Sequence, residues 1–178
     1  MRSETSPMAD YRDHHATIFV APEVAGPIEA ARRAWDPVTA AQIAAHVTLA
    51  YPQEAPISDL LVERVREASN NVPPFRFRLG DVACFECPEG GAYITVEDID
   101  GGYREMREEL LRPPFRGIAY HPHVTVVHPR TSRRGREFLE SGCYRSQAHE
   151  FAAEEVTITA FDGVKWVVLV TFALAGKR

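Results

Sequence analysis

The sequence predicts an α+β fold in a single domain. Segments in which apolar and polar residues alternate, as in half-buried strands, are mixed with segments whose apolar residues recur at helical spacing. The strands do not alternate regularly with helices, and Asp162-Gly163 is a strong hairpin signal between the last two. The 178 residues are 45% hydrophobic and 25% charged. Such a chain can bury a core without a metal or disulfide, and no low-complexity linker divides it.

The first half of the chain is expected to contain both helices and strands after a polar tail. Residues 1–14 show no periodicity and are predicted to be a mobile N-terminal tail, which leaves 15–178 as the folded domain. The expected elements, in order, are a strand at 16–21, a helix at 27–35, a short helical segment at 37–43, a strand at 46–50 and a helix that Ser58 would cap. Pro27 suits the first turn of its helix, and Pro52 ends the second strand.

The second half is expected to be richer in strands. The expected elements, in order, are strands at 75–79, 82–86 and 92–97, a helix at 103–111, a strand at 123–127, a short helix at 137–140, and strands at 156–160 and 164–174. Phe75, Phe77 and Leu79 alternate with arginines, which is typical of a strand with one buried face. Residues 88–91 and Pro129 supply turn and stop signals.

A heptapeptide occurs twice, once in each half of the chain. Residues 46–52 read HVTLAYP and residues 123–129 read HVTVVHP, so four of the seven positions are identical. Both copies look like strands that end at a proline. A third His-x-Thr, at His15-Ala16-Thr17, lacks the rest of the motif and is interpreted as a chance match.

The repeated motif contains residue types suited to chemistry at phosphorus. Residues two apart on a strand share a face, so His46 projects with Thr48, and His123 with Thr125. If the two strands lie on opposite sides of one cleft, a neutral imidazole could take a proton from water while a protonated one donates to the leaving oxygen. The hydroxyls could donate to phosphate oxygens. A single strand histidine is more often structural, but two matched copies favour a catalytic pair.

These strands resemble those of the 2H phosphoesterase superfamily, in its branch of 2′-5′ RNA ligases and RNA 2′,3′-cyclic phosphodiesterases. The resemblance extends over residues 17–174 and includes residues 74–82 and 120–125 around the motifs. It implies two pseudosymmetric lobes, each with an antiparallel-rich sheet flanked by helices, and an active cleft between them. It also implies metal-independent hydrolysis of a cyclic phosphate to a 2′-phosphomonoester. His46 and His123 would be catalytic, and Thr48 and Thr125 would bind phosphate.

Three further residues are candidates for substrate binding. Many relatives carry arginine five residues after the second catalytic histidine, where this chain has His128. Tyr51 fills the matching place in the first motif; simple alternation turns it away from His46, so either base stacking or core packing is open. Arg130 begins a run with Arg133, Arg134 and Arg136, which would be either a solvated loop or a rim that attracts an anion.

Composition limits the partners that the chain could have. A net charge of −5 is unfavourable for general nucleic-acid binding, although an RNA end or small nucleotide is still possible. His121 and His123 share a strand face without a suitably spaced carboxylate, so no metal and no cofactor are expected. The three cysteines and the charged N-terminus favour a cytoplasmic protein, and no apolar run approaches the ~20 residues that span a membrane.

The substrate is left open by the sequence, because no motif identifies its specificity loops. We expect a monomer without an obligate protein partner that acts on a 2′,3′-cyclic phosphate of an RNA end or small nucleotide. The same chemistry could act on a cyclic phosphate of ADP-ribose or on a 2′-5′-linked oligonucleotide. A non-catalytic module that binds RNA ends or nucleotides is the alternative from another functional class.

Overall fold

The computed structural model of the chain describes residues 13–85, 90–145 and 148–177. Most of the predicted tail and part of the predicted 88–91 turn lie outside the described residues. The tail boundary at residue 14 needs correction, because His14 is buried and is the first residue of strand β1. Its Nδ1 is 2.8 Å from the Ser58 hydroxyl. Among the described residues, no helix is long and apolar enough to cross a membrane.

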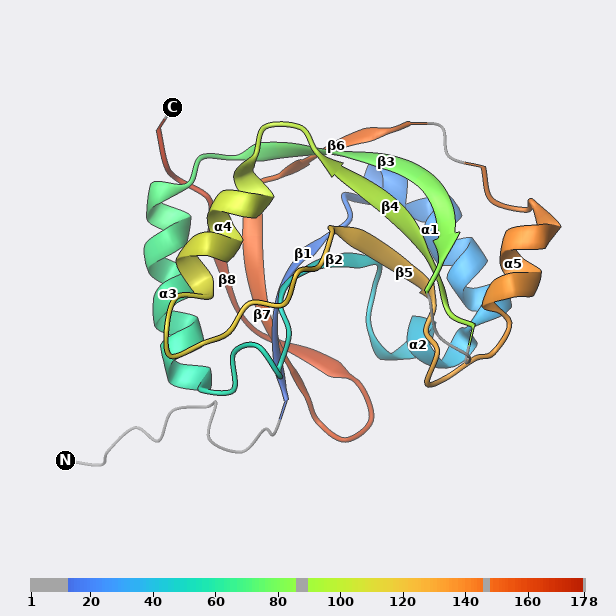
Figure 1. The fold of residues 1–178 in the computed structure, drawn as a ribbon, viewed down its shortest axis with the longest axis horizontal. Coiled ribbons are helices and arrows are strands. Elements are labelled where there is room, and N and C mark those ends of the chain that lie inside the picture. Colours follow the sequence, from blue (N-terminus) through green and yellow to red (C-terminus); the bar gives the residue numbers. More distant parts are fainter. Residues whose placement is uncertain (1–12, 86–89, 146–147, 178) are drawn as a thin grey trace.

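The strands form one curled antiparallel sheet in the order β6-β3-β4-β5-β2-β1-β7-β8 (Figure 1). Their bounds are β1 His14–Phe19, β2 His46–Ala50, β3 Phe75–Cys84, β4 Ala92–Asp98, β5 His123–Val127, β6 Glu150–Ala153, β7 Glu155–Phe161 and β8 Trp166–Ala173. The α+β class and the antiparallel pairing are therefore confirmed. The sheets expected for two lobes are instead the halves of one eight-stranded sheet, joined where β2 pairs with β5.

Helices flank both ends of this sheet. The described helices are α1 Pro22–Trp35, α2 Pro37–Gln42, α3 Ser58–Asn71, α4 Gly102–Leu110 and α5 Gly135–Ser141. Figure 1 shows α3 and α4 at one side of the molecule and α1, α2 and α5 at the other. Buried side chains from helices and from the apolar face of the sheet, such as Ile28, Leu61, Met106, Val47 and Val124, belong to one core cluster. The opposite face of β2 and β5 is left for polar side chains.

Several element boundaries differ from those that the sequence predicts. Helix α1 begins at Pro22, in the first turn where a missing N–H costs nothing, and it continues through Pro27, which cannot donate to the Glu23 carbonyl. Strand β3 is continuous through residues 79–82, where a shift of register against β4 replaces the predicted break. Strand β6 was not predicted, since four residues with an exposed glutamate carry almost no periodic signal. Ile57 occupies the N-cap position of α3 without a side-chain hydrogen bond, so Ser58 is the first residue of the helix and not its cap.

Candidate active site

The two repeated motifs lie side by side on neighbouring strands. Val47 of β2 pairs with Val124 of β5 in an antiparallel register, and both valines are fully buried. Residues that flank this pair therefore face each other across the strands on the opposite side of the sheet. His46 lies across from Thr125, and Thr48 lies across from His123. The two strands, expected from the sequence on opposite sides of a cleft, are neighbours in the structure. Their two histidines and two threonines form one patch, which is called the catalytic patch after the role proposed below.

A β-bulge near the end of β2 turns Tyr51 towards this patch. Residues 16 and 17 of β1 pair with Ala50 and Thr48, so Leu49 has no partner on β1. Leu49 and Ala50 are both fully buried, which means that two consecutive residues face the core and the alternation changes phase. Tyr51 consequently returns to the face of Thr48. The assumption of simple alternation in the sequence analysis was wrong at this position.

Strand β5 contains the same bulge at the matching place. Residues 92 and 93 of β4 pair with Val127 and Thr125, which leaves Val126 without a partner on β4. Val126 and Val127 are both fully buried. The next residue, His128, is therefore turned towards the catalytic patch in the same way as Tyr51.

Each histidine of the pair is oriented by a backbone carbonyl two residues earlier. His46 Nδ1 lies 2.8 Å from the Ala44 oxygen, and His123 Nδ1 lies 2.8 Å from the His121 oxygen. Because a carbonyl only accepts hydrogen bonds, Nδ1 carries the proton in the neutral form of each ring. Nε2 is then the nitrogen that gains or loses a proton. The two rings are matched in orientation as well as in sequence.

The surroundings favour the neutral form of both rings. Burial lowers the pKa of His46 to about 4; its hydrogen bond to Ala44 opposes this shift, and the positive charges of Arg32, His123 and His128 add to it. Burial also lowers the pKa of His123, against the opposing effect of its hydrogen bond to His121. The pKa of His46 is therefore the more strongly lowered of the two, and this ring stays neutral to lower pH.

Tyr51 joins the two motifs. Its hydroxyl is 3.4 Å from His123 Nε2, and its ring lies 4.8 Å from the Tyr120 ring, centroid to centroid. Burial raises the pKa of Tyr51 far above its ordinary value, so the phenol keeps its proton and can donate a hydrogen bond. The Thr48 hydroxyl opposes part of that shift, which indicates that it also lies beside the phenol oxygen.

Buried carboxylates hold the residues that follow the two bulges. Glu54 accepts the Tyr51 N–H at 3.1 Å, and Asp36 accepts the His128 N–H at 2.8 Å. Glu54 is also paired with Arg107, whose guanidinium donates to the Leu49 carbonyl at 2.7 Å. Sequence analysis missed these three charged residues because nothing in their local sequence distinguishes them from surface charges.

Asp36 is an ionised carboxylate although it is buried. Burial raises its pKa, but hydrogen bonds from the Thr131 hydroxyl and from the N–H groups of His128 and Thr39 outweigh burial and lower it overall. Its contacts with Thr131 and His128 span 2.7 and 2.8 Å. Asp36 therefore ties the end of β5 to the start of α2.

His15, which the sequence analysis set aside, lies beside the catalytic patch. Its ring stacks on Trp166 at 3.7 Å and lies 6.3 Å from the His46 ring and 6.0 Å from the Tyr51 ring. Burial, followed by the charges of His46, His128 and His14, lowers the pKa of His15 well below its ordinary value. A neutral aromatic wall thus borders the His46 side of the patch.

The other predicted site residues have different surroundings. His123 is bordered by Phe85 and Tyr93, with ring centroids 5.5 and 5.2 Å away. Arg130 is exposed, and its N–H donates to His128 Nδ1 at 3.1 Å. Within the described ranges, no three histidine, cysteine, aspartate or glutamate side chains are grouped so that they could hold a metal ion.

Comparison with known structures identifies the fold. Escherichia coli LigT complexed with 3′-AMP superposes with a TM-score of 0.65 and 18% identity, over 93% of this chain and 99% of LigT. A protein of Thermus thermophilus gives a TM-score of 0.64 at 18% identity, over 93% of this chain and all of that one. A structure described as a phosphoesterase gives 0.61 at 16% identity, over 92% and 98% of the two chains. At such identities the likeness establishes a shared fold.

Sequence comparison identifies the family. No curated protein matches the chain. A family model of the 2′-5′ RNA ligase superfamily matches residues 20–165, which include both heptapeptides and all the strands described above except β1 and β8. The chain therefore belongs to the 2′-5′ RNA ligase superfamily of 2H phosphoesterases.

Proposed function

We propose that this protein is a metal-independent phosphodiesterase that opens a 2′,3′-cyclic phosphate of an RNA end or small nucleotide to a 2′-phosphomonoester. The observation that carries the proposal is the matched pair of imidazoles on adjacent strands, each held at Nδ1 by a carbonyl at 2.8 Å. Two rings whose Nε2 atoms are the nitrogens that gain or lose a proton are suited to accept one proton and donate another at a single phosphorus atom.

The pKa of His46 is lowered more than that of His123, and this difference supports a division of roles between the two rings. His46, whose pKa is lowered to about 4, would take a proton from the attacking water as general base. The water oxygen bonds to phosphorus while the bond from phosphorus to the 3′ oxygen breaks. Protonated His123 would then donate its Nε2 proton to that departing oxygen, and an anionic phosphate bound nearby would favour the protonated ring. Before the next turnover, His46 releases its proton and His123 takes one up.

Hydroxyl donors would stabilise the negative charge on the non-bridging phosphate oxygens. Thr48 and Thr125 face each other diagonally across the patch and could each donate to a non-bridging phosphate oxygen. The Tyr51 phenol, which burial keeps protonated, is a third donor close to His123 Nε2. With an imidazolium, these donors can balance a phosphodiester without a divalent cation.

The solved relatives bind ligands of a compatible class. LigT has been crystallised with 3′-AMP, NADP+, ATP and phosphate. These ligands are phosphate itself or nucleotides that contain phosphate. A nucleotide with a strained cyclic phosphate is the substrate that best fits a site with two proton-transfer groups.

The proposal is tested by hydrolysis of 2′,3′-cyclic nucleotides and of RNA with a cyclic end, each with and without EDTA. We expect turnover that EDTA does not change and a product that is the 2′-phosphate by chromatography. A metal-dependent enzyme would instead lose its activated water with the metal. Nucleotide binding without any turnover would contradict the proposal and favour the non-catalytic module.

A further inference from the structure

We propose that the loop between β5 and α5 binds the sugar–phosphate backbone of an RNA strand whose cyclic end lies in the catalytic patch. The preferred substrate would then be an oligoribonucleotide and not a free mononucleotide. The inference rests on the proposed function, because it takes the cyclic phosphate as the reacting group. It starts from the arginine-rich segment 130–136, which begins directly after the motif that ends at Pro129.

The backbone of this loop is held in place on both sides. The Thr131 hydroxyl donates to Asp36 at 2.7 Å, and the Ser132 hydroxyl donates to the Trp35 carbonyl at 3.0 Å. On the other side, Gly135 packs so closely on the β3–β4 turn that a Cβ there would clash with the Gly90 carbonyl oxygen. A loop that is already ordered loses little conformational entropy when it binds a ligand.

The arginines of this loop differ in their partners. Arg134 is engaged, with its Nε 3.2 Å from Glu137 and its guanidinium 4.4 Å from the centre of the Trp35 ring. Arg130 and Arg133 are exposed, and in the part of the chain that the structure describes no ion pair joins either of them to a carboxylate. They present two positive charges to solvent from a fixed backbone.

These two charges are placed where they could contact an RNA chain that extends out of the catalytic patch. Arg130 donates its N–H to His128, and its positive charge, second to burial, lowers the pKa of that imidazole. An RNA chain that extends past His128 would meet Arg130, and the exposed Arg133 lies three residues further along the same loop, whereas a mononucleotide would not extend beyond the patch. The protein as a whole carries a charge of −5, so attraction of a polyanion has to come from a local cluster.

The experiment compares 2′,3′-cyclic AMP with a hexa-adenylate that ends in the same cyclic phosphate, from 50 to 200 mM KCl. The readout is kcat/KM of the hexanucleotide divided by that of the mononucleotide. Each phosphate contact on a single strand contributes about 0.7 to the slope of log affinity against log salt. In Arg130→Ala/Arg133→Ala the slope of the log ratio against log salt should therefore be smaller in magnitude by about 1.4. Between 50 and 200 mM KCl the ratio should then fall about 7-fold less than in the original chain.

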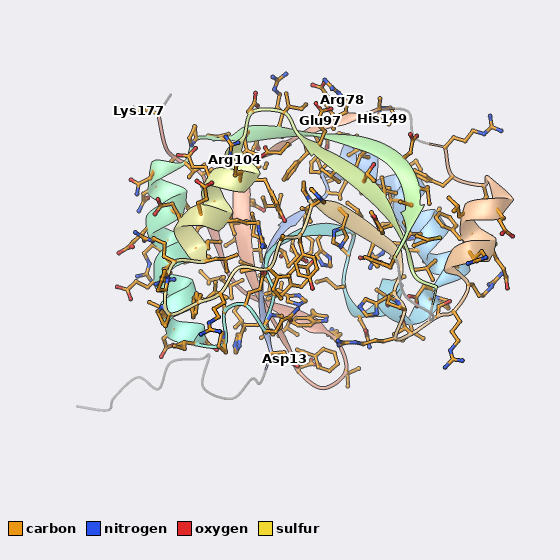
Figure 2. The ribbon with its side chains drawn as sticks, viewed as in Figure 1. Asp13, Arg78, Glu97, Arg104, His149 and Lys177 are labelled. Carbon is orange, nitrogen blue, oxygen red and sulfur yellow. The ribbon has the colours of Figure 1, made fainter. Side chains whose placement is uncertain are left out.

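Two controls distinguish charge from structure. Arg104→Ala removes an exposed arginine from α4, on the side of the molecule away from α5 (Figure 2), and should leave the ratio unchanged. Arg130→Lys/Arg133→Lys should keep most of the salt slope, because the phosphate contact needs a charge and not a particular side chain.

The two proposals fail in distinguishable ways. Equal ratios and slopes in the original chain and in the double alanine variant would overturn the role of the loop. If the cyclic phosphates are nevertheless hydrolysed, the proposed phosphodiesterase activity still holds. If neither substrate is hydrolysed, fluorescence anisotropy with a labelled hexa-adenylate 3′-phosphate decides. Binding that the double alanine variant weakens would support the loop after the proposed function has failed, and unchanged binding would reject both.

Discussion

Replacement of Glu54 by alanine tests whether the buried ion pair of Glu54 with Arg107 stabilises the protein and the backbone at Tyr51. The Glu54 side chain is fully buried, the Arg107 side chain is 10% exposed, and Arg107 Nη2 lies 2.7 Å from Glu54 Oε1. The carboxylate also accepts N–H groups from Tyr51 at 3.1 Å and from Ile118 at 2.6 Å. In Glu54→Ala the guanidinium stays buried with only carbonyl partners, and breaking such a pair destabilises a protein by about 3–5 kcal/mol.

This loss is large enough to measure by thermal unfolding. For a chain of this length each kcal/mol changes Tm by about 2–4 °C, so Glu54→Ala should lower Tm by about 6–20 °C. Circular dichroism or differential scanning fluorimetry would measure the change, with Glu108→Ala, an exposed glutamate of α4, as the matched control. The Tyr51 N–H also loses its acceptor, so kcat/KM on a cyclic phosphate should fall at a temperature where the variant is folded.

A second variant shows whether the unpaired charge of Arg107 causes the loss of stability in Glu54→Ala. Glu54→Ala/Arg107→Met removes the guanidinium together with its partner, and should be less destabilised than Glu54→Ala alone. A fall in Tm of less than about 2 °C in Glu54→Ala, or strictly additive losses in the double variant, would refute the reasoning.

Three further predictions concern the catalytic patch. His46→Ala and His123→Ala should each lower kcat by ~10²–10⁴, and the double variant should be little slower than either, as single-turnover kinetics can determine. Thr48→Val and Thr125→Val should each cost ~3–4 kcal/mol of barrier with an unchanged Tm; a matching loss of stability would mean that the hydroxyls are structural. Plotted against pH, kcat/KM should follow a bell with its maximum below pH 6.5. It should fall at high pH as His123 loses its proton and at low pH as His46 gains one near pH 4; a maximum above pH 7 would contradict these roles.

Much of the fold could be predicted from the sequence because its signals are local. Alternation in β3 and β5, the Asp162-Gly163 turn and the prolines that end β2 and β5 act within a few residues of the chain. The repeated heptapeptide likewise needed no structure, because identity at four of seven positions is rare by chance and the positions two apart on a strand share a face. The sequence by itself therefore determined the class, the order of most elements and the pairing of each histidine with its threonine.

Only the tertiary structure decided how these parts meet. The register that sets Val47 against Val124 joins strands that are far apart in the sequence, and it turned two expected sheets into one. The bulges that redirect Tyr51 and His128 arise from pairing with β1 and β4, which no local pattern records. Glu54 acquires its role for the same reason, since two of its partners, Arg107 and Ile118, are far away in the sequence. Alternation along one strand is a property of the local backbone, whereas its phase against a neighbour depends on contacts between residues distant in the chain.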